Sequence, residues 1–209
     1  MITIAIAGKI YNSVNLQVII EDIHKRINQV YINFSNAYIK SALEAISLAQ
    51  RGNNIEAELS NALNNMRISI NVLKDLLEEK RAYLIFFERD ALTEDKKVDV
   101  CLRISNLYKI NAILSKLLNY RYSDINLNKE NSIEWFDKGI EMEASLKIKN
   151  GYYVEEYVEE VDATYSFMEK GYVDKHYDYS ESEKLSIRKD ARQKTLNYKY
   201  EVEKDLNSL

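Results

Sequence analysis

The side chains best suited to chemistry in this sequence are concentrated between Tyr152 and Glu183. That segment contains seven of the sixteen tyrosines and ten carboxylates but only two lysines, a formal charge of −8 in a chain whose net charge is −4. Carboxylates attract cationic groups, and tyrosine combines a large rigid ring with a hydroxyl that can hydrogen-bond. The segment is therefore a candidate binding surface, and no other part of the chain offers so directional a surface chemistry.

Catalytic and metal-binding patterns are weak elsewhere. Glu21 and His24 have the Glu-x-x-His spacing that di-iron helical bundles use, but that chemistry needs a second such pair, and Val173 stands at the matching place before His176. Cys101 is the only cysteine, which excludes an internal disulfide and a CxxC motif. Two histidines offer no evident catalytic triad or zinc site, and no acid–base pair stands out among so many carboxylates. We therefore predict no cofactor and no bound metal.

Composition indicates a globular, largely helical chain. Of its 209 residues, 46% are hydrophobic and 30% charged, as in soluble proteins with one domain or two small, closely packed ones. Proline is absent, which suits helices because proline costs about 3 kcal/mol in a helix interior. We see no secretory signal and no apolar run of the ~20 residues that span a bilayer, so we expect a cytoplasmic location. The acidic balance argues against direct nucleic-acid binding.

Three long helices are predicted in the first part of the chain. Apolar residues recur at helical spacing in each, with a suggested break near Ser35-Asn36 and a stop at Arg51-Gly52. Asn54 is a plausible N-cap for the second helix, and 90–97 is the polar turn before the third. Short connections and inward-facing apolar stripes predict an antiparallel bundle within an all-α fold. The predicted helices are Leu16–Ala49, Asn54–Phe87 and Val98–Leu118.

Three shorter helices are predicted after the polar stretch 121–132, which we take as the boundary between a bundle core, 1–122, and a second region, 123–209. Ser132 would cap the first of them, and Ser180 with Glu183 forms a capping box for the last. Asn150-Gly151 and Gly171 are the expected helix stops. We expect the two regions to pack as one compact unit. The predicted helices are 132–150, 152–170 and 180–209.

Two short stretches resemble known families. The opening MITIAIAGK is similar to the strand and first loop residues of ParA/MinD-type ATPases, but the second Gly-Lys-Ser/Thr is missing, and Ile10 and Tyr11 would obstruct a phosphate cradle. We interpret it as a short apolar lead-in that docks on the bundle. Leu48–Leu63 resembles the hairpin turn of tetratricopeptide repeats, yet no second copy follows at the spacing of that family.

Wound as a helix, the acidic segment would separate into an apolar seam and a carboxylate face. Glu155/Glu159 and Glu156/Glu160 would then be like-charge i, i+4 pairs, each unfavourable by about 0.2–0.5 kcal/mol. Three explanations are open: a solvated face screened by salt, internal pairing with the basic stretch Lys184–Lys199, or an external cationic partner. The seam would hold Val154, Tyr157, Val158, Val161, Tyr165 and Met168.

The favoured hypothesis is a non-enzymatic interaction protein, an adaptor or inhibitor that presents the acidic, tyrosine-rich helix face to a basic protein partner. A phage-type inhibitor of a nucleic-acid-handling complex would fit, because a row of carboxylates can imitate phosphates. Two alternatives are a self-assembling structural subunit and an enzyme with a carboxylate metal site inside the bundle. We expect no membrane partner, and a homo-oligomer is left open. The predicted partner-binding residues are Tyr153, Glu155, Glu156, Glu159, Glu160, Asp162, Tyr172, Tyr177 and Tyr179.

Overall fold

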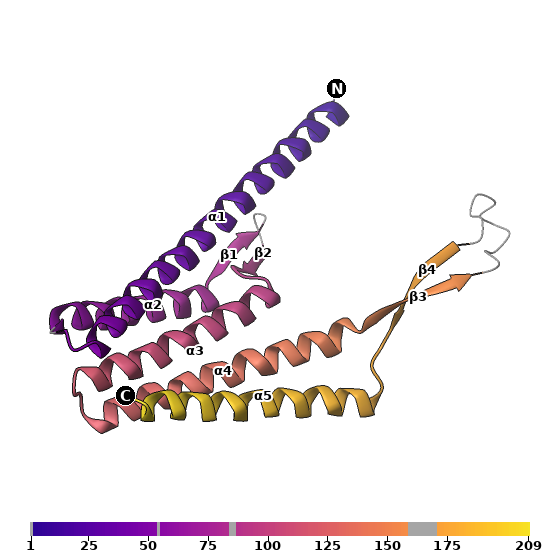
Figure 1. Ribbon diagram of the computed structural model, residues 1–209. Coiled ribbons are helices and arrows are strands. Elements are labelled where there is room, and N and C mark those ends of the chain that lie inside the picture. Colours follow the sequence, from indigo (N-terminus) through magenta and orange to yellow (C-terminus); the bar gives the residue numbers. More distant parts are fainter. Residues whose placement is uncertain (1, 54, 84–86, 159–170) are drawn as a thin grey trace.

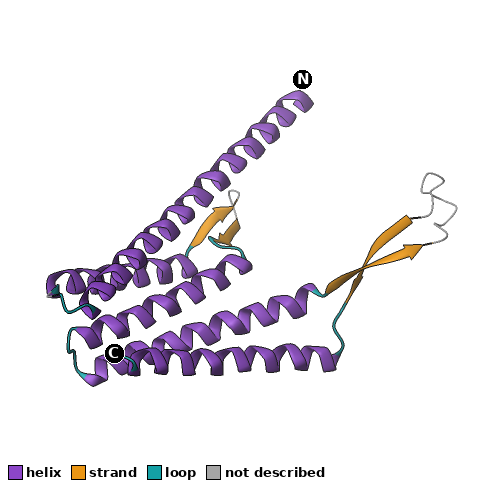
Figure 2. Cartoon of the chain, viewed as in Figure 1, coloured by secondary structure: helices purple, strands orange, loops and turns teal. Residues whose placement is uncertain are grey.

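The computed structural model describes residues 2–53, 55–83, 87–158 and 171–209 (Figure 1). Within these ranges the chain is mostly helical, with five helices and two antiparallel hairpins of two strands each (Figure 2). The broad prediction of a helical bundle is confirmed. In chain order the elements are α1 (Ile2–Gln50), α2 (Glu56–Glu78), β1 (Lys80–Tyr83), β2 (Phe87–Asp90), α3 (Glu94–Leu117), α4 (Tyr122–Asn150), β3 (Tyr152–Val158), β4 (Gly171–Tyr177) and α5 (Glu181–Asn207).

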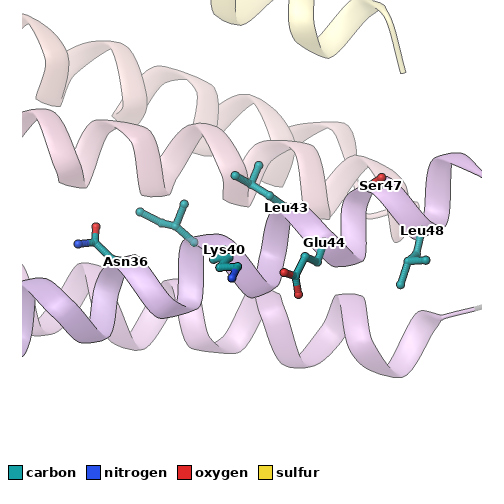
Figure 3. Close-up of a pocket in the computed structure, with 7 residues that line it drawn as sticks. Asn36, Lys40, Leu43, Glu44, Ser47 and Leu48 are labelled. Atoms are coloured by element: carbon teal, nitrogen blue, oxygen red, sulfur yellow. The ribbon is translucent and has the colours of Figure 1, made fainter.

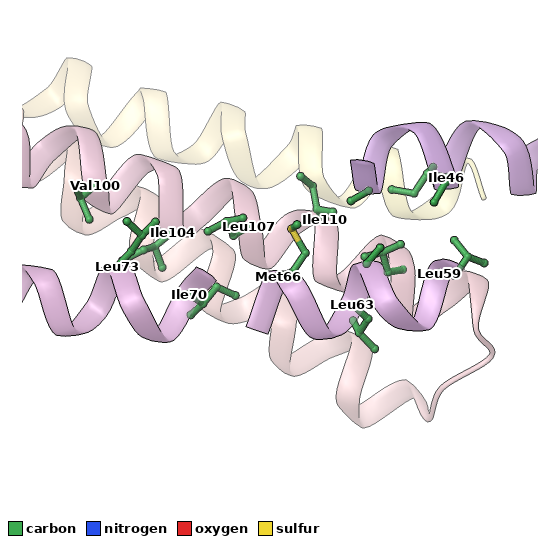
Figure 4. Packing of buried hydrophobic residues seen from close by; sticks show 14 of the residues in the cluster. Ile46, Leu59, Leu63, Met66, Ile70, Leu73, Val100, Ile104, Leu107 and Ile110 are labelled. Atoms are coloured by element: carbon green, nitrogen blue, oxygen red, sulfur yellow. The ribbon is translucent and has the colours of Figure 1, made fainter. Parts of the chain in front are cut away.

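The main hydrophobic core lies where α2, α3 and the C-terminal half of α1 meet (Figure 4). Its residues on α2 and α3 recur every three or four positions, so they share one face of each helix. The inward-facing stripes expected for these two helices are confirmed. The buried members are Ala42, Ala45 and Ile46 on α1, Leu59, Ala62, Leu63, Met66, Ile70, Leu73 and Leu76 on α2, Leu92 before α3, and Val100, Ile104, Leu107, Ile110 and Leu114 on α3.

Helix α1 is continuous, and its N-terminal half extends away from the bundle (Figure 1). The predicted break at Ser35-Asn36 is wrong, because the Ser35 hydroxyl donates to the carbonyl of Ile32 within the helix at 2.9 Å. The opening residues belong to this helix, so the strand implied by the ATPase resemblance and the docked lead-in are both wrong. The predicted inward stripe is also wrong at Ile27 and Phe34, whose side chains are exposed.

Helix α2 ends at Glu78, nine residues before the predicted end at Phe87. The chain then forms the β1–β2 hairpin, in which Lys80 pairs with Asp90 and Tyr83 with Phe87. Tyrosine, isoleucine and phenylalanine between these positions favour strands over helix, and apolar periodicity alone did not reveal this. The predicted N-cap Asn54 lies outside the described residues.

Helices α3 and α4 are joined by a tight turn, in which Asn119 has a φ of +54°. Helix α4 already begins at Tyr122, so the polar stretch 121–132 is part of a helix, and Ser132 is a buried interior residue instead of a cap. The two helices approach closely at Gly139, where a β-carbon would lie 2.9 Å from a methyl group of Leu102. The absence of a side chain at Gly139 therefore permits this close approach of α3 and α4.

After α4 the prediction of a helix over 152–170 is wrong for 152–158, because Tyr152–Val158 is strand β3 and pairs with β4. The remaining part of that prediction, 159–170, lies outside the described residues. Among the residues described after 121, the chain has two helices, α4 with 29 residues and α5 with 27. Gly151 ends α4 with a φ of +60° and a ψ of −153°, which leads directly into the strand. The capping box at Ser180 and Glu183 is confirmed at the start of α5. Within the described ranges, none of the helices combines the length and hydrophobicity that crossing a bilayer requires.

Candidate binding surface

The β3–β4 hairpin projects beyond the ends of α4 and α5 (Figure 1). Its register runs from Tyr152 opposite Tyr177 to Val158 opposite Gly171. Successive side chains on a strand point to opposite faces of the sheet. Among the described side chains, one face therefore carries Tyr152, Val154, Lys175 and Tyr177, and the other carries Tyr153, Glu155, Asp174 and His176.

The base of the hairpin is held by aromatic and polar contacts. His176 Nε2 lies 2.9 Å from the carbonyl oxygen of Asn150, the last residue of α4. The ring of Tyr152 stacks on that of Tyr177 with centroids 5.8 Å apart and meets that of Tyr179 at 5.1 Å. Aromatic pairs at such distances contribute about 0.5–1.5 kcal/mol beyond area burial. Tyr177 and Tyr179, both predicted to bind a partner, therefore pack against Tyr152 at the base of the hairpin.

The face with Tyr153 combines an exposed aromatic ring with two opposed carboxylates. The Tyr153 side chain is 69% exposed, and its ring meets that of His176 edge to face at a centroid distance of 5.1 Å. Glu155 stands directly opposite Asp174 in the register, and both residues are exposed. Like charges directly opposite on neighbouring strands destabilise the pairing. A cationic group placed between these carboxylates would remove that repulsion.

The predicted partner-binding residues thus fall into separate groups. Tyr153 and Glu155 share the exposed face, while Glu156 and Tyr172 occupy register positions opposite Val173 and Tyr157. The like-charge i, i+4 reasoning is wrong for Glu155 and Glu156, because both belong to a strand. Sequence reasoning did not single out Asp174 and His176. A period-two reading of 152–158 could have found the strand, but their pairing depends on the register. Glu159, Glu160 and Asp162 lie outside the described residues.

Helix α5 packs along α4, and this contact positions the end of β4, the strand that precedes α5. The ammonium of Lys194 on α5 lies 3.1 Å from Glu143 on α4. The hydroxyl of Thr195, the next residue of α5, donates to Asp137 on α4 at 2.8 Å. Within the basic stretch Lys184–Lys199, Lys194 therefore contacts α4, whereas Lys184 pairs with Glu181 of the acidic segment.

A second set of ion pairs connects α5 with α3. Lys109 lies 2.7 Å from Glu201 and 2.6 Å from Asp205. Burial lowers the pKa of Lys109, but its hydrogen bonds to the two carboxylates outweigh that effect and leave the pKa raised. At the other end of α5, Lys184 pairs with Glu181 in the first turn at 2.8 Å. The two pairs of Lys109 hold α5 against α3, whereas the Lys184–Glu181 pair lies within α5.

A buried hydroxyl cluster joins α3, α4 and α5. The Ser105 hydroxyl donates to the Ser132 carbonyl at 2.7 Å, and the Ser132 hydroxyl donates to the Ser105 carbonyl at 2.9 Å. The Tyr198 hydroxyl lies 3.0 Å and 2.9 Å from the two serine hydroxyls, and its ring stacks on Phe136 at 3.9 Å. Because strand β3 follows α4 and β4 precedes α5, this cluster holds both ends of the hairpin in place.

Other candidate sites offer less. A hollow along α1 is lined only by residues of that helix, among them Lys40 and Glu44, whereas ligand pockets enclose most of a small molecule (Figure 3). Cys101 is buried, and burial raises its thiol pKa, so it is a poor nucleophile. The buried polar residues of the described core are serines and one asparagine. In the same part of the chain, no group of three or more His, Cys, Asp or Glu residues could hold a metal ion.

Comparison with protein-family models, curated proteins and solved structures found no match to this chain.

Proposed function

We propose that this chain is a non-enzymatic interaction protein, an adaptor or inhibitor whose helical body presents the acidic, tyrosine-rich β3–β4 hairpin to a basic protein partner. The proposal rests on one observation: the hairpin projects from the body with Tyr153 exposed beside the opposed carboxylates Glu155 and Asp174. We also infer that neighbouring helices of the body run antiparallel, because short turns or hairpins connect them.

The hairpin has features of a surface that gains stability from a partner. Two strands alone are marginally stable in water, and β3 and β4 pair only with each other in the described part of the chain. Their outer edges therefore offer backbone N–H and C=O groups to another chain. Repulsion between Glu155 and Asp174 adds a cost that persists until a cation approaches.

The chemistry of the exposed face selects the class of partner. Arginine can bind a carboxylate through two parallel hydrogen bonds and can stack on a tyrosine ring, so one guanidinium could engage both kinds of group on this face. Basic surfaces that normally meet nucleic-acid phosphates have this chemistry. An inhibitor of a nucleic-acid-handling complex, of the phage type, is the specific identity that we favour.

The test compares three forms of the full chain as baits in extracts of its native cell. Glu155→Gln with Asp174→Asn removes the opposed charges, and Glu134→Gln with Glu141→Gln removes two exposed charges from α4 as a matched control. We expect the unmodified chain and the control to retain a basic protein, and the hairpin variant to bind it roughly tenfold more weakly, about 1.4 kcal/mol.

The binding should also weaken as salt rises, since exposed charges are screened. Equal capture by all three baits would overturn the proposal, and so would equal loss from the hairpin variant and the α4 control. In that second case net charge alone, and not the hairpin face, would drive the binding.

A further inference from the structure

Helix α1 carries a row of exposed apolar side chains that the core does not use. Ile23, Ile27, Val30 and Phe34, here called the α1 seam, are between 39% and 57% exposed. They precede Ala42, the first residue of α1 whose buried side chain belongs to the hydrophobic core. Contiguous apolar surface of this kind on a folded protein marks an interaction site.

The seam is distinct from the face by which α1 joins the body. The Asn28 side-chain amide donates to the carbonyl of Ala91 at 3.1 Å, and Arg103 of α3 donates to the side chains of Ser35 and Asn36. Further along, Ala42 and Ile46 enter the core. Docking at the seam therefore leaves the contacts between α1 and the body intact.

The spacing of the seam specifies a helical partner. Its members are separated by four, three and four residues, an average period of about 3.5, and Ile20 and Leu16 continue the same spacing in the sequence. A period of 3.5 keeps one helix face against another helix over several turns, through left-handed supercoiling. From Ile23 to Phe34 the seam is about 17 Å long at the α-helical rise.

The segment of α1 that carries the seam also needs to pack against another element to be a stable helix. Isolated helices are marginal in water, and β-branched residues such as Ile23, Ile27 and Val30 have lower helix propensity than leucine or alanine. A helical segment rich in such residues gains most of its stability from burial of its apolar face. A partner helix therefore stabilises this segment of α1 more than it would stabilise an alanine-rich helix.

We propose that the α1 seam pairs with the same seam of a second copy of this chain, forming a two-helix coiled coil. A twofold interface uses one surface patch twice, so a regular apolar row is its own complement. The charged residues beside the seam would cause little repulsion between two copies. Asp22 and Arg26 form an ion pair within their own helix at 2.8 Å. Among the described side chains between Val18 and Phe34, Lys25 is the other charged residue. A cationic or anionic partner would find no complementary charge cluster on this seam.

The test measures the mass of the full chain by sedimentation equilibrium over a range of concentrations. We expect an equilibrium between the 24.5 kDa chain and a species of twice that mass. Ile27→Lys with Phe34→Lys should raise the dimer dissociation constant by about a hundredfold or more, because charges would enter the interface. Far-UV circular dichroism and urea unfolding check that the body of the variant remains folded.

The matched control places lysines at two equally exposed apolar positions of α5. Leu185 and Leu196 are 52% and 59% exposed, so Leu185→Lys with Leu196→Lys makes the same chemical change away from the seam. This control should keep the dissociation constant of the unmodified chain. A chain that stays monomeric at several hundred micromolar, or a seam variant that still forms dimers, overturns the proposal. The partner-binding proposal for the hairpin is unaffected by either result.

Discussion

The contribution of Tyr198 to the attachment of α5 can be measured in two steps. Tyr198→Phe removes the hydroxyl that meets Ser105 and Ser132 at 3.0 Å and 2.9 Å. Both serine hydroxyls keep a carbonyl acceptor, at 2.7 Å and 2.9 Å, so the substitution leaves no serine unpaired. Loss of hydrogen bonds under these conditions costs about 0.5–1.5 kcal/mol. We therefore expect the free energy of unfolding to fall by about 1 kcal/mol.

Tyr198→Ala removes the ring as well. That ring stacks on Phe136 with centroids 3.9 Å apart and planes 7° apart, and the Lys109 ammonium lies 5.9 Å from its centroid. Replacing a large aromatic residue by alanine in a core costs about 3–5 kcal/mol. Because Tyr198 is half-buried, we expect the lower end of this range, about 3 kcal/mol.

The assay is urea unfolding followed by far-UV circular dichroism, with the slope of free energy against urea compared between variants. Tyr200→Phe is the matched control, since Tyr200 is exposed on the same helix, and it should stay within about 0.5 kcal/mol of the unmodified chain. If Tyr198→Phe behaved like this control and Tyr198→Ala cost less than about 1 kcal/mol, the hydroxyl cluster would not be what holds α5 on α3 and α4.

Two further predictions concern the start and end of the segment that carries the hairpin. Gly151→Ala should loosen the hairpin, because the new β-carbon would collide with the carbonyl oxygen of Tyr177 and lie 2.6 Å from His176 Nε2. Gly52→Ala is the control: Gly52 also has a positive φ but has open space around it, so this substitution should lower the free energy of unfolding less. Amide hydrogen exchange in β3 and β4 measures this, and equal protection in both variants would contradict it. Hydrogen bonds from the Ser180 hydroxyl and backbone amide lower the pKa of Glu183 below its usual 4.5. The stability that these hydrogen bonds provide is therefore present above pH 4.5 and is lost as the pH falls through the folded-state pKa of Glu183. Carbon-13 NMR titration should show the Glu183 midpoint below 4.5 and its return towards that value in Ser180→Ala, whereas an unchanged midpoint would refute the role of the cap.

Helix prediction succeeded where apolar periodicity coincides with burial. The spacing of Leu63, Met66 and Ile70 on α2 indicated the core face correctly, because residues three and four apart share one side of a helix. The prediction failed at β3, where Val154, Tyr157 and Val158 also have helical spacing. Valine and tyrosine favour strands, and pairing with a segment from 171 onwards satisfies their backbone groups.

The candidate binding surface was predictable in composition but not in shape. The sequence indicated that the acidic, tyrosine-rich segment is exposed, and Tyr153 and Glu155 are indeed on the surface. It could not indicate that Glu155 would face Asp174, because that proximity comes from strand register and not from spacing along one helix.

The sequence by itself determined that this chain is mostly helical, that α5 starts with a capping box, and that one acidic segment dominates its surface chemistry. These properties depend on local propensity and composition, which act over a few residues. Only the tertiary structure decided which face of α1 is buried. Ile27 and Phe34 have the spacing of a core stripe, yet the buried core residues of α1 begin only at Ala42, and these two side chains remain in solvent. Periodicity places residues on one face of a helix, and only packing decides whether another element covers that face.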